Sequence, residues 1–451
     1  MRIAVIGGGL GGLTAARALV EAGLDAHVLE AGSRAGGVIG TSRAGAFVRE
    51  HAASSVLGGA PRGALALCQA LGVPVEQASP RARRRLIFID GKLRALPQNP
   101  LELVRSDLLT WRGKLDLLRE PLRAARLPGN DDESMHAFAA RRFGAEAARA
   151  IVAPFVTGVY AADAHDISLA AGFPRLAALE ADGGVVRGLV RQTARGALHR
   201  AFAAIQGKPS APRPSRGLWA PRGGLQELVD ALAAGLGPRV HFGHPVARIE
   251  PAGPDRVAID GETWDGAVLA LPAEDALPLV AMPELAARLS VFHRAPTAIV
   301  YLGFPAAAVP RATDGFGFLV AQGEDVRVLG VVFESIVWPD RAPPGHLLLR
   351  CIFGGGRDPS AAALDDAALI AQATRDVARV LEASGSPVHA SVVRWRRGVA
   401  QYAVGHRDHV RAAVTAARTH RIVLAGADYR GPGVNDLCAD ADVVLGEVRA
   451  W

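Results

Sequence analysis

The chain has 451 residues, of which 50% are hydrophobic and 21% charged, with a formal net charge of +7. This length exceeds one ordinary hydrophobic core, so we expect two or three globular domains rather than a disordered or fibrous chain. The three cysteines, Cys68, Cys351 and Cys438, lie far apart, which excludes a disulfide framework and a thiolate metal site and indicates a reducing, cytoplasmic location.

The chain opens with the pattern of a dinucleotide-binding turn. Residues 3–6 are a continuous apolar run, as in a strand that is buried on both faces of a parallel sheet. A strand that starts this early leaves no room for a signal peptide, so we expect none. Gly7, Gly9 and Gly12 follow in G-x-G-x-x-G spacing, which suits a tight turn, close approach to a pyrophosphate and close packing of a helix on the strand.

The residues that follow strengthen this prediction. A helix that begins near Gly11 would point its first amides at the phosphates. A second strand over residues 26–29 ends at Glu30, at the distance expected for an acid that binds a ribose hydroxyl. Segment 34–37 then reads Arg-x-Gly-Gly, where a nicotinamide-binding domain has no need of a second glycine pair. A purely structural glycine turn would not explain these features together.

The middle of the chain predicts a hairpin, a helical region and a linker. Residues 85–98 predict a hairpin around a turn at Asp90. Residues 101–206 predict a mainly helical region, and residues 207–217 a linker or loop.

Basic residues concentrate over 81–126, which fits a solvated face, an anionic-substrate site or an anionic membrane surface. They lack interleaved aromatics, so we expect no nucleic-acid partner. No apolar stretch reaches the ~20 residues that span a bilayer.

Short strands dominate the second half of the chain, with a helix predicted over residues 365–384. The predicted strands cover residues 240–242, 246–249, 257–259, 266–271, 299–302, 316–320, 328–333 and 347–353. Residues 421–436 then predict a strand, a glycine-rich turn and the start of a final helix. This segment is either an ordinary strand–helix turn or a second helix N-terminus that faces a bound phosphate or ring.

Segment 34–37 resembles flavoproteins of the amine oxidase and phytoene desaturase superfamily, in which such a segment runs along FAD. Over nearly the whole chain, more specific segments are similar to the protoporphyrinogen oxidase family. PFVTGVY at 154–160 and QYxxGH at 401–406 are the most specific of them. The others cover residues 85–100, 161–163, 168–174, 221–228, 316–320, 338–343 and 433–436.

The resemblance implies an α/β fold with a discontinuous, Rossmann-like FAD-binding domain, a mixed-sheet α+β substrate domain and a mainly helical insertion. In this interpretation the FAD-binding domain comprises residues 1–80, 215–275 and 405–451. The substrate domain comprises residues 81–98 and 276–404, and residues 99–206 form the insertion, which resembles the family's membrane-associated domain. Peripheral attachment to the cytoplasmic face of a membrane is therefore expected, and a second copy of the chain is a candidate partner.

The resemblance also implies FAD as cofactor and the oxidation of protoporphyrinogen IX to protoporphyrin IX with O₂, which releases H₂O₂. Flavin N5 takes the hydride, so no catalytic side chain is required. We expect no metal. His406 and His409 lack an acid or cysteine at ligand spacing, so surface or structural roles are favoured.

The family's substrate-binding arginine corresponds to Arg85, whose guanidinium would bind a propionate; the alternative is that Arg85 merely ends a basic run. Four apolar residues match the family's pocket positions, although alternating apolar residues of strands usually belong to a core. These four are Phe316, Leu319, Val332 and Ile352. Other members have Leu or Phe at positions 332 and 352, so the pocket here would be wider.

The cofactor-binding residues implied by the glycine motifs and the resemblance fall in five segments. They are Gly7, Gly8, Gly9, Gly11 and Gly12; Glu30, Ala31, Arg34, Gly36, Gly37 and Val38; Ala52, Ala53, Ser54 and Ser55; Val246; and Ala427, Pro432, Gly433 and Val434. Two of them depart from the family pattern, because Ala52 stands where glycine is common and Ser54 where asparagine is common. Both changes would weaken cofactor seating or turnover.

Three alternatives stay open. The first is oxidation of coproporphyrinogen III to coproporphyrin III on the same fold and cofactor. The second is an amine oxidase or carotenoid desaturase, against which the family-specific segments argue. The third is a non-catalytic FAD- and porphyrin-binding protein, which only Ala52 and Ser54 favour.

Overall fold

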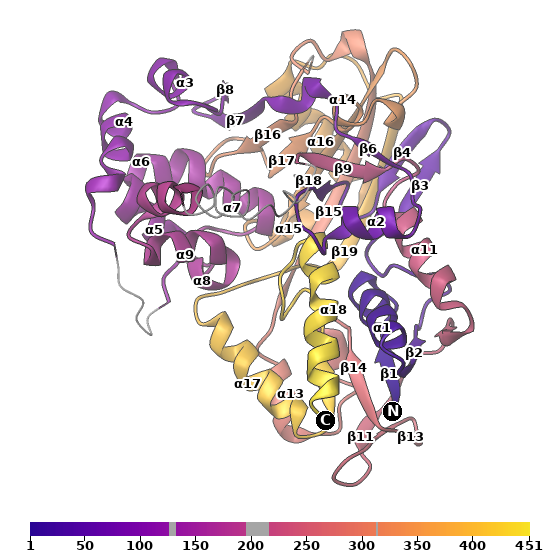
Figure 1. The fold of residues 1–451 in the computed structure, drawn as a ribbon. Helices are drawn as coiled ribbons and strands as arrows, with labels where there is room; N and C mark the ends of the chain where they lie inside the picture. The colour runs from indigo at the N-terminus through magenta and orange to yellow at the C-terminus, as the bar shows by residue number, and fades with distance from the viewer. Residues whose placement is uncertain (126–131, 195–215, 313) are drawn as a thin grey trace, which may run out of the picture.

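The computed structural model describes residues 1–125, 132–194, 216–312 and 314–451 (Figure 1). Within these ranges, a five-stranded parallel sheet draws its strands from distant parts of the chain. Their order is β10 (Val240–His241), β2 (Asp25–Leu29), β1 (Arg2–Ile6), β14 (Gly266–Leu269) and β20 (Ile422–Leu424). The discontinuous Rossmann-like fold that the family resemblance implies is therefore confirmed, although the exact domain boundaries stay a prediction.

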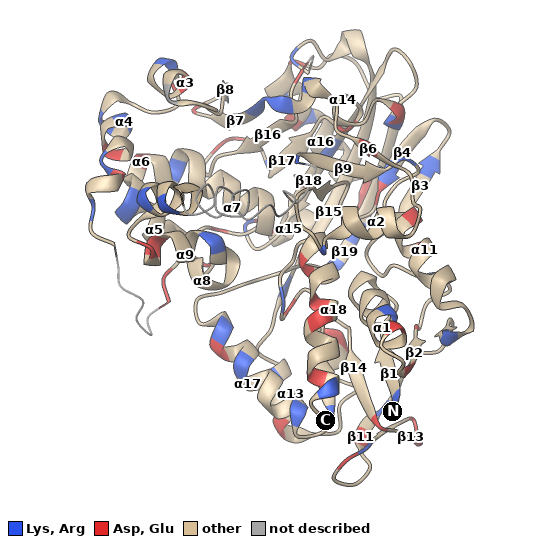
Figure 2. Ribbon diagram, in the orientation of Figure 1, with Lys and Arg blue, Asp and Glu red and all other residues tan. Residues whose placement is uncertain are grey.

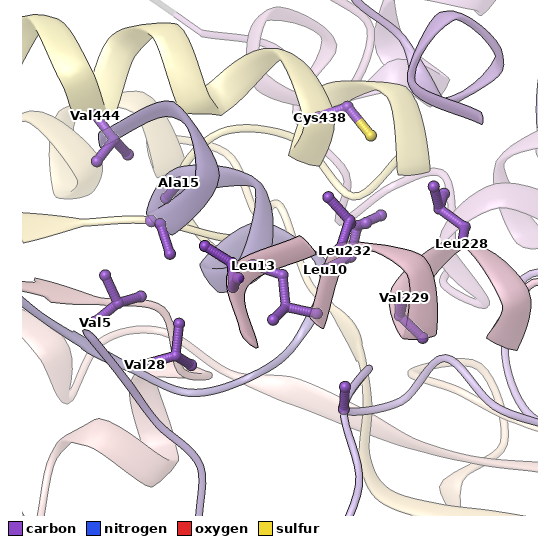
Figure 3. Packing of buried hydrophobic residues seen from close by; sticks show 14 of the residues in the cluster. Val5, Leu10, Leu13, Ala15, Val28, Leu228, Val229, Leu232, Cys438 and Val444 are labelled. Carbon is purple, nitrogen blue, oxygen red and sulfur yellow. The ribbon is translucent and has the colours of Figure 1, made fainter. Parts of the chain in front are cut away.

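Both faces of this sheet are buried, as the apolar run of β1 predicts. Ile3 and Val5 pack toward three helices, whose contributing side chains are shown in Figure 3. These helices are α1 (Leu10–Glu21), α11 (Gln226–Leu236) and α18 (Val434–Arg449). Ala4 and Ile6 face the opposite way. There they meet β11 (Ile249–Pro251), β12 (Val257–Ile259), β13 (Glu262–Trp264), α12 (Ala273–Ala276), α13 (Pro283–Leu289) and α17 (His406–Arg418).

A seven-stranded mixed sheet forms the second layer. Its order is β19 (His389–Ala400), β15 (Arg294–Pro305), β18 (His346–Gly354), β17 (Gly330–Val332), β16 (Gly317–Val320), β7 (Arg85–Ile89) and β8 (Lys92–Ala95). The β7–β8 hairpin is confirmed: Asp90 and Gly91 both have positive φ, 51° and 70°, as a tight hairpin turn requires. One face of this sheet packs on α16 (Asp366–Leu381), α15 (Pro359–Ala362) and α14 (Glu334–Val337).

Smaller elements connect the two layers. They are the hairpin of β3 (Thr41–Ala44) with β4 (Phe47–Glu50), the sheet of β5 (Val56–Leu57), β9 (Leu218–Pro221) and β6 (Val75–Gln77), and helix α2 (Ala64–Ala70). The helical region contains α3 (Pro100–Arg105), α4 (Trp111–Leu118), α5 (Met135–Phe143), α6 (Ala145–Ala147), α7 (Ala153–Tyr160), α8 (Leu169–Gly172) and α9 (Pro174–Ala181). Most of the linker predicted at 207–217 lies outside the described residues.

Two predicted strands, 246–249 and 328–333, begin later in the structure than predicted, for an identifiable reason. Residues 246–248 do not pair as a strand, because the amides of Ala247 and Arg248 donate to the carboxylate of Asp260 instead (3.0 and 2.7 Å). Likewise, β17 begins only at Gly330, because Asp376 accepts the amides of residues 327 and 328 (3.0 and 2.9 Å). In each case a side-chain carboxylate replaces the neighbouring strand as the hydrogen-bond partner.

Candidate functional site

The glycine turn after β1 forms a close-packed bend with one open position. Gly7 has φ +106°, and its amide donates to the Leu29 carbonyl (2.9 Å). A Cβ on Gly12 would lie 2.0 Å from the Gly7 carbonyl oxygen, so helix and strand tolerate no side chain there. A Cβ on Gly9, by contrast, would have nothing within 4 Å. The turn therefore keeps free backbone surface at Gly9, directly at the N-terminus of α1.

Glu30 lies against this turn. Its carboxylate accepts the amides of Gly8 and Gly32 (2.6 and 2.7 Å). Ala31 follows it and is exposed. The Glu30 carbonyl accepts the His244 amide (2.9 Å), which places the segment leading to Val246 beside the end of β2. The acid thus sits where the sequence predicts an adenosine ribose to bind.

Segment 34–38 folds over the same turn. Arg34 donates to the carbonyls of Ala35, Gly37 and Ile39 (3.0, 2.9 and 2.7 Å), so this arginine shapes the loop. The Gly36 amide donates to the Gly8 carbonyl (2.8 Å), and a Cβ on Gly37 would lie 3.3 Å from the Gly9 Cα. Val38 is exposed beyond them. The two glycine pairs are therefore adjacent.

The C-terminal turn reaches this place from the other end of the chain. Gly433 precedes α18, and its amide donates to Asp436 (3.1 Å). Thr14 of α1 donates to the Leu437 carbonyl (3.2 Å), so the first turns of α1 and α18 lie side by side. Pro432 and Val434 flank Gly433, and the carbonyl of Ala427 accepts the Tyr402 hydroxyl (2.5 Å). The structure thus brings together segments that are 400 residues apart.

Segment 50–55 lies where the two layers meet. Tyr301 donates its hydroxyl to the Glu50 carbonyl (2.7 Å), and the Trp395 indole donates to the His51 carbonyl (2.7 Å). Arg350 donates to the carbonyl of Ala52. Ala53 and Ser55 are half-buried and Ser54 is buried. Directly after this segment, the Leu57 carbonyl of β5 accepts a hydrogen bond from Asn435 in the first turn of α18 (2.7 Å), which ties β5 to the C-terminal turn.

The predicted substrate residues share one face of the seven-stranded sheet, which we call the wall face. Leu319, Val332 and Ile352 lie on this face and are half-buried. Their neighbours Phe318, Val331 and Cys351 are fully buried on the opposite face, against α16. Successive side chains of a strand point to opposite faces of the sheet. Leu319, Val332 and Ile352 are therefore less buried than the core residues next to them in the same strands.

Arg85 and Phe316 stand at the edge of the wall face. Arg85 is the exposed first residue of β7, and its guanidinium carbon lies 5.4 Å from the centroid of the Phe316 ring. Phe316 and Val332 pack against a buried cluster that contains Trp338. Gly158 of α7 approaches Leu319 so closely that a Cβ there would lie 2.8 Å from Cδ2 of that leucine. The helical region therefore covers one end of the wall face.

A cluster of buried charges surrounds Glu50, at the start of segment 50–55, and was not predicted from the sequence. Glu50, Glu334 and Arg341 are no more than 1% exposed, and Arg350 is 8% exposed. Arg341 pairs with Glu50 (3.0 Å between Nη1 and Oε1). Burial raises the pKa of Glu334 to about 7, although Arg350 and Arg341 oppose the shift. The available sequence signal was a charged residue within apolar runs, as at Arg350 in Leu-Leu-Leu-Arg-Cys-Ile-Phe.

The structure also shows the surroundings of His406, for which the sequence favours a surface or structural role. His406 is buried, stacks on Tyr402 (ring centroids 4.0 Å apart) and bonds the Asp428 carbonyl (2.9 Å), which is a structural role. Within the described ranges, no group of three or more His, Cys, Asp or Glu residues could hold a metal ion. Among the helices that the structure describes, none is long and apolar enough to cross a membrane.

Comparison with known proteins gives consistent matches. The family described as "Flavin containing amine oxidoreductase" matches residues 10–436. Protoporphyrinogen oxidase of Bos taurus is 32% identical, over 96% of this chain and 95% of that protein. The chloroplastic protoporphyrinogen oxidase of Oryza sativa subsp. japonica is 30% identical, over 91% and 81%.

Solved structures share the fold across the whole chain. A putative protoporphyrinogen oxidase from Exiguobacterium sp. 255-15 has a TM-score of 0.82 at 22% identity, covering 100% of this chain and 99% of that one. Cyclohexylamine oxidase from Brevibacterium oxydans has a TM-score of 0.69 at 17% identity, with the same coverage. At these identities the likeness concerns the fold alone.

Proposed function

Because the chain belongs to the flavin-containing amine oxidoreductases, and among them to the protoporphyrinogen oxidase family, we propose that it oxidises protoporphyrinogen IX to protoporphyrin IX. The electrons would pass to O₂, so that three two-electron oxidations consume three O₂ and release three H₂O₂. The observation that carries the proposal is the wall face: one sheet presents the half-buried Leu319, Val332 and Ile352 and also holds segment 50–55 through Arg350.

FAD is the cofactor of this family, and the residues around the glycine turn fit it. The open backbone at Gly9 and the N-terminus of α1 suit a pyrophosphate. Glu30, beside them, suits the ribose, and the N-terminus of α18 suits the polar end of the ring. When bound, FAD supplies the acceptor for the hydride that leaves a methylene bridge of the substrate.

The chain's own contribution is to bind and orient the substrate. Arg85, exposed at the start of β7, would bind a propionate through its two parallel N–H groups. The apolar side chains of the wall face would contact the flat faces of the macrocycle and exclude water from the bridge carbon that reacts. The buried cluster of Ala82, Ala220, Val337 and Trp338 packs against Phe316 and Val332, which fixes this edge of the surface.

The test of the proposal is anaerobic mixing of the FAD-loaded protein with porphyrinogen, followed by its flavin absorbance and by porphyrin fluorescence in air. Bleaching by protoporphyrinogen IX, with fluorescent product and peroxide after O₂ is added, is expected. A kcat/KM tenfold higher for coproporphyrinogen III would assign the alternative substrate. Absence of bleaching by either compound would leave a porphyrin-binding role and end the oxidase proposal.

Replacing Arg85 with alanine is expected to raise KM for protoporphyrinogen IX roughly 10- to 100-fold. The reason is that a charge-assisted hydrogen bond contributes about 1.5–3 kcal/mol. FAD content should not change, since Arg85 is remote from the glycine turn. Arg83→Ala, from the same basic run, is the matched control and should keep the normal KM. An unchanged KM in Arg85→Ala would contradict the propionate role.

The helical region carries an exposed apolar edge, for which we propose peripheral attachment to the cytoplasmic face of a membrane. Trp111, Leu115, Leu118 and Leu122 are 50–78% exposed and recur at helical spacing. Arg105, Arg112 and Arg119 are exposed around them, and Figure 2 shows basic segments along α4 and α5. Apolar side chains ringed by cations are typical of a surface that binds anionic lipid.

Sedimentation with vesicles that contain an anionic phospholipid tests this attachment. Wild-type protein should co-sediment at low salt and less so at high salt. A Leu118→Ser/Leu122→Ser variant should remain in the supernatant. Val388→Ser is the control, because Val388 is 59% exposed outside the helical region. Absence of wild-type binding at low salt would count against attachment.

A further inference from the structure

Three consecutive carbonyls of segment 50–55 are held by side chains from three neighbouring strands. Tyr301 comes from β15, Arg350 from β18 and Trp395 from β19, and these strands are adjacent in the order β19-β15-β18. The Tyr301 hydroxyl also accepts the Glu50 amide (3.1 Å). Such a row of side-chain bonds to successive backbone groups fixes the position of a segment much more tightly than its own turn would.

Arg350 is the charged member of this row, and it is buried between apolar neighbours. It is 8% exposed and reaches a carbonyl 298 residues away in the chain. Leu349 and Cys351, on either side of it in β18, are fully buried. Burying a cation in an apolar strand costs free energy unless partners compensate it. Glu50 and Glu334 are both buried nearby, and the charge of Arg350 favours the ionised form of each carboxyl group, although burial raises the pKa of both.

The same strand also contributes to the wall face. Ile352 lies two residues after Arg350 and so points to the same side of the sheet. Val332 is paired with Arg350 across β17 and β18. Arg350 therefore connects, within one strand pair, the surface proposed for the substrate and the carbonyl of Ala52, which lies in a segment predicted to face the flavin.

We propose that Arg350 is a positioning residue for the cofactor: by holding the Ala52 carbonyl it fixes segment 52–55 against the flavin and aligns the flavin with the wall face. This function explains how Ala52 and Ser54 are tolerated where glycine and asparagine are common. A side chain of the seven-stranded sheet, and not a side chain of segment 52–55 itself, fixes the position of this segment. The inference rests on FAD as the cofactor and not on the identity of the substrate.

The experiment compares Arg350→Met and Arg350→Lys with wild type. Apoprotein is titrated with FAD, and the flavin midpoint potential is measured with dithionite, so no porphyrinogen is involved. Arg350→Met should bind FAD at least tenfold more weakly and shift the potential and the visible spectrum. Lysine keeps the positive charge but lacks the planar fork of the guanidinium group. Arg350→Lys should therefore have an FAD affinity and a midpoint potential between those of Arg350→Met and wild type. If porphyrinogen is the substrate, kcat should fall more than KM rises.

Arg394→Met is the matched control, because Arg394 of β19 also donates to a backbone carbonyl, that of Ala362, away from segment 50–55. It should leave FAD affinity and potential unchanged. If Arg350→Met loses thermal stability but keeps wild-type FAD affinity, potential and spectrum, its role is purely structural and the proposal is overturned.

If Arg350→Met does not fold, Tyr301→Phe removes the hydroxyl that bonds the carbonyl and the amide of Glu50 and keeps the ring, and Trp395→Phe removes the indole N–H that bonds the His51 carbonyl. Both should weaken FAD binding in the same direction, by a smaller factor. Wild-type FAD affinity and potential in both variants would overturn the proposal.

Discussion

Replacing Gly9 with alanine should leave the apoprotein folded and reduce its affinity for FAD about 100-fold or more, which corresponds to about 2.8 kcal/mol. A methyl group at Gly9 meets no protein atom within 4 Å, and the backbone there has φ −69°, which alanine adopts without strain. The space that the methyl group would fill is the space that the pyrophosphate needs. Circular dichroism and thermal unfolding of the apoprotein, with FAD titration, give the measurement.

Gly12→Ala is the contrasting variant. Its Cβ would lie 2.0 Å from the Gly7 carbonyl oxygen, so α1 and β1 must separate. We expect loss of FAD together with loss of the folded apoprotein. Gly9 is thus required for contact with the cofactor and Gly12 for packing of the helix on the strand, although both are glycines of the same sequence motif. Normal FAD affinity in a folded Gly9→Ala variant would place the phosphates elsewhere.

Replacing Arg341 with methionine should destabilise the protein by about 3–5 kcal/mol, because it leaves the buried Glu50 without its cationic partner. Arg341 is 1% exposed and Glu50 is fully buried, so solvent cannot compensate. The Glu50 carboxylate also accepts the Leu225 amide and the Thr41 hydroxyl (3.1 and 2.8 Å), which joins both layers. The urea midpoint at saturating FAD measures the loss.

The double variant Glu50→Gln/Arg341→Met is the control for uncompensated charge. Glutamine keeps an acceptor oxygen for Leu225 or Thr41 but carries no charge, so the double variant should be more stable than Arg341→Met alone. If the single and double variants unfold at the same urea concentration, the loss comes from packing of the arginine stem and not from a stranded carboxylate.

The parts of the fold that local sequence dictates could be predicted. The glycine turn requires particular backbone angles and close approaches, and the turn at Asp90 requires positive φ, so both leave a mark in the sequence. Strand β19 has almost no such local signal in its sequence. Its Arg-Trp-Arg-Arg run looks exposed, yet Trp395 reaches back to the His51 carbonyl. Such a strand is stabilised by distant partners that no local pattern reveals.

Some residues of the candidate site could likewise be predicted from the local sequence, and others could not. Periodicity placed Leu319, Val332 and Ile352 in strands but could not say which face borders a core, because both faces are apolar. The cluster of Glu50, Glu334, Arg341 and Arg350 could not be predicted, since it forms only where β4 meets the seven-stranded sheet, and its ion pair joins Glu50 to Arg341 from a distant part of the chain. Burial of charged groups becomes visible only when the tertiary contacts are known.

The order of strands in the five-stranded sheet has a consequence for biosynthesis. β1 and the glycine turn are synthesised before β14 and β20, which complete their sheet and lie at residues 266–269 and 422–424. At about 5–20 residues per second, synthesis of the intervening chain takes roughly 20–80 s. During that time the apolar faces of β1 and α1 lack their partners. The two turns proposed to hold FAD, after β1 and before α18, therefore come together only once the strands of the C-terminal part have been synthesised.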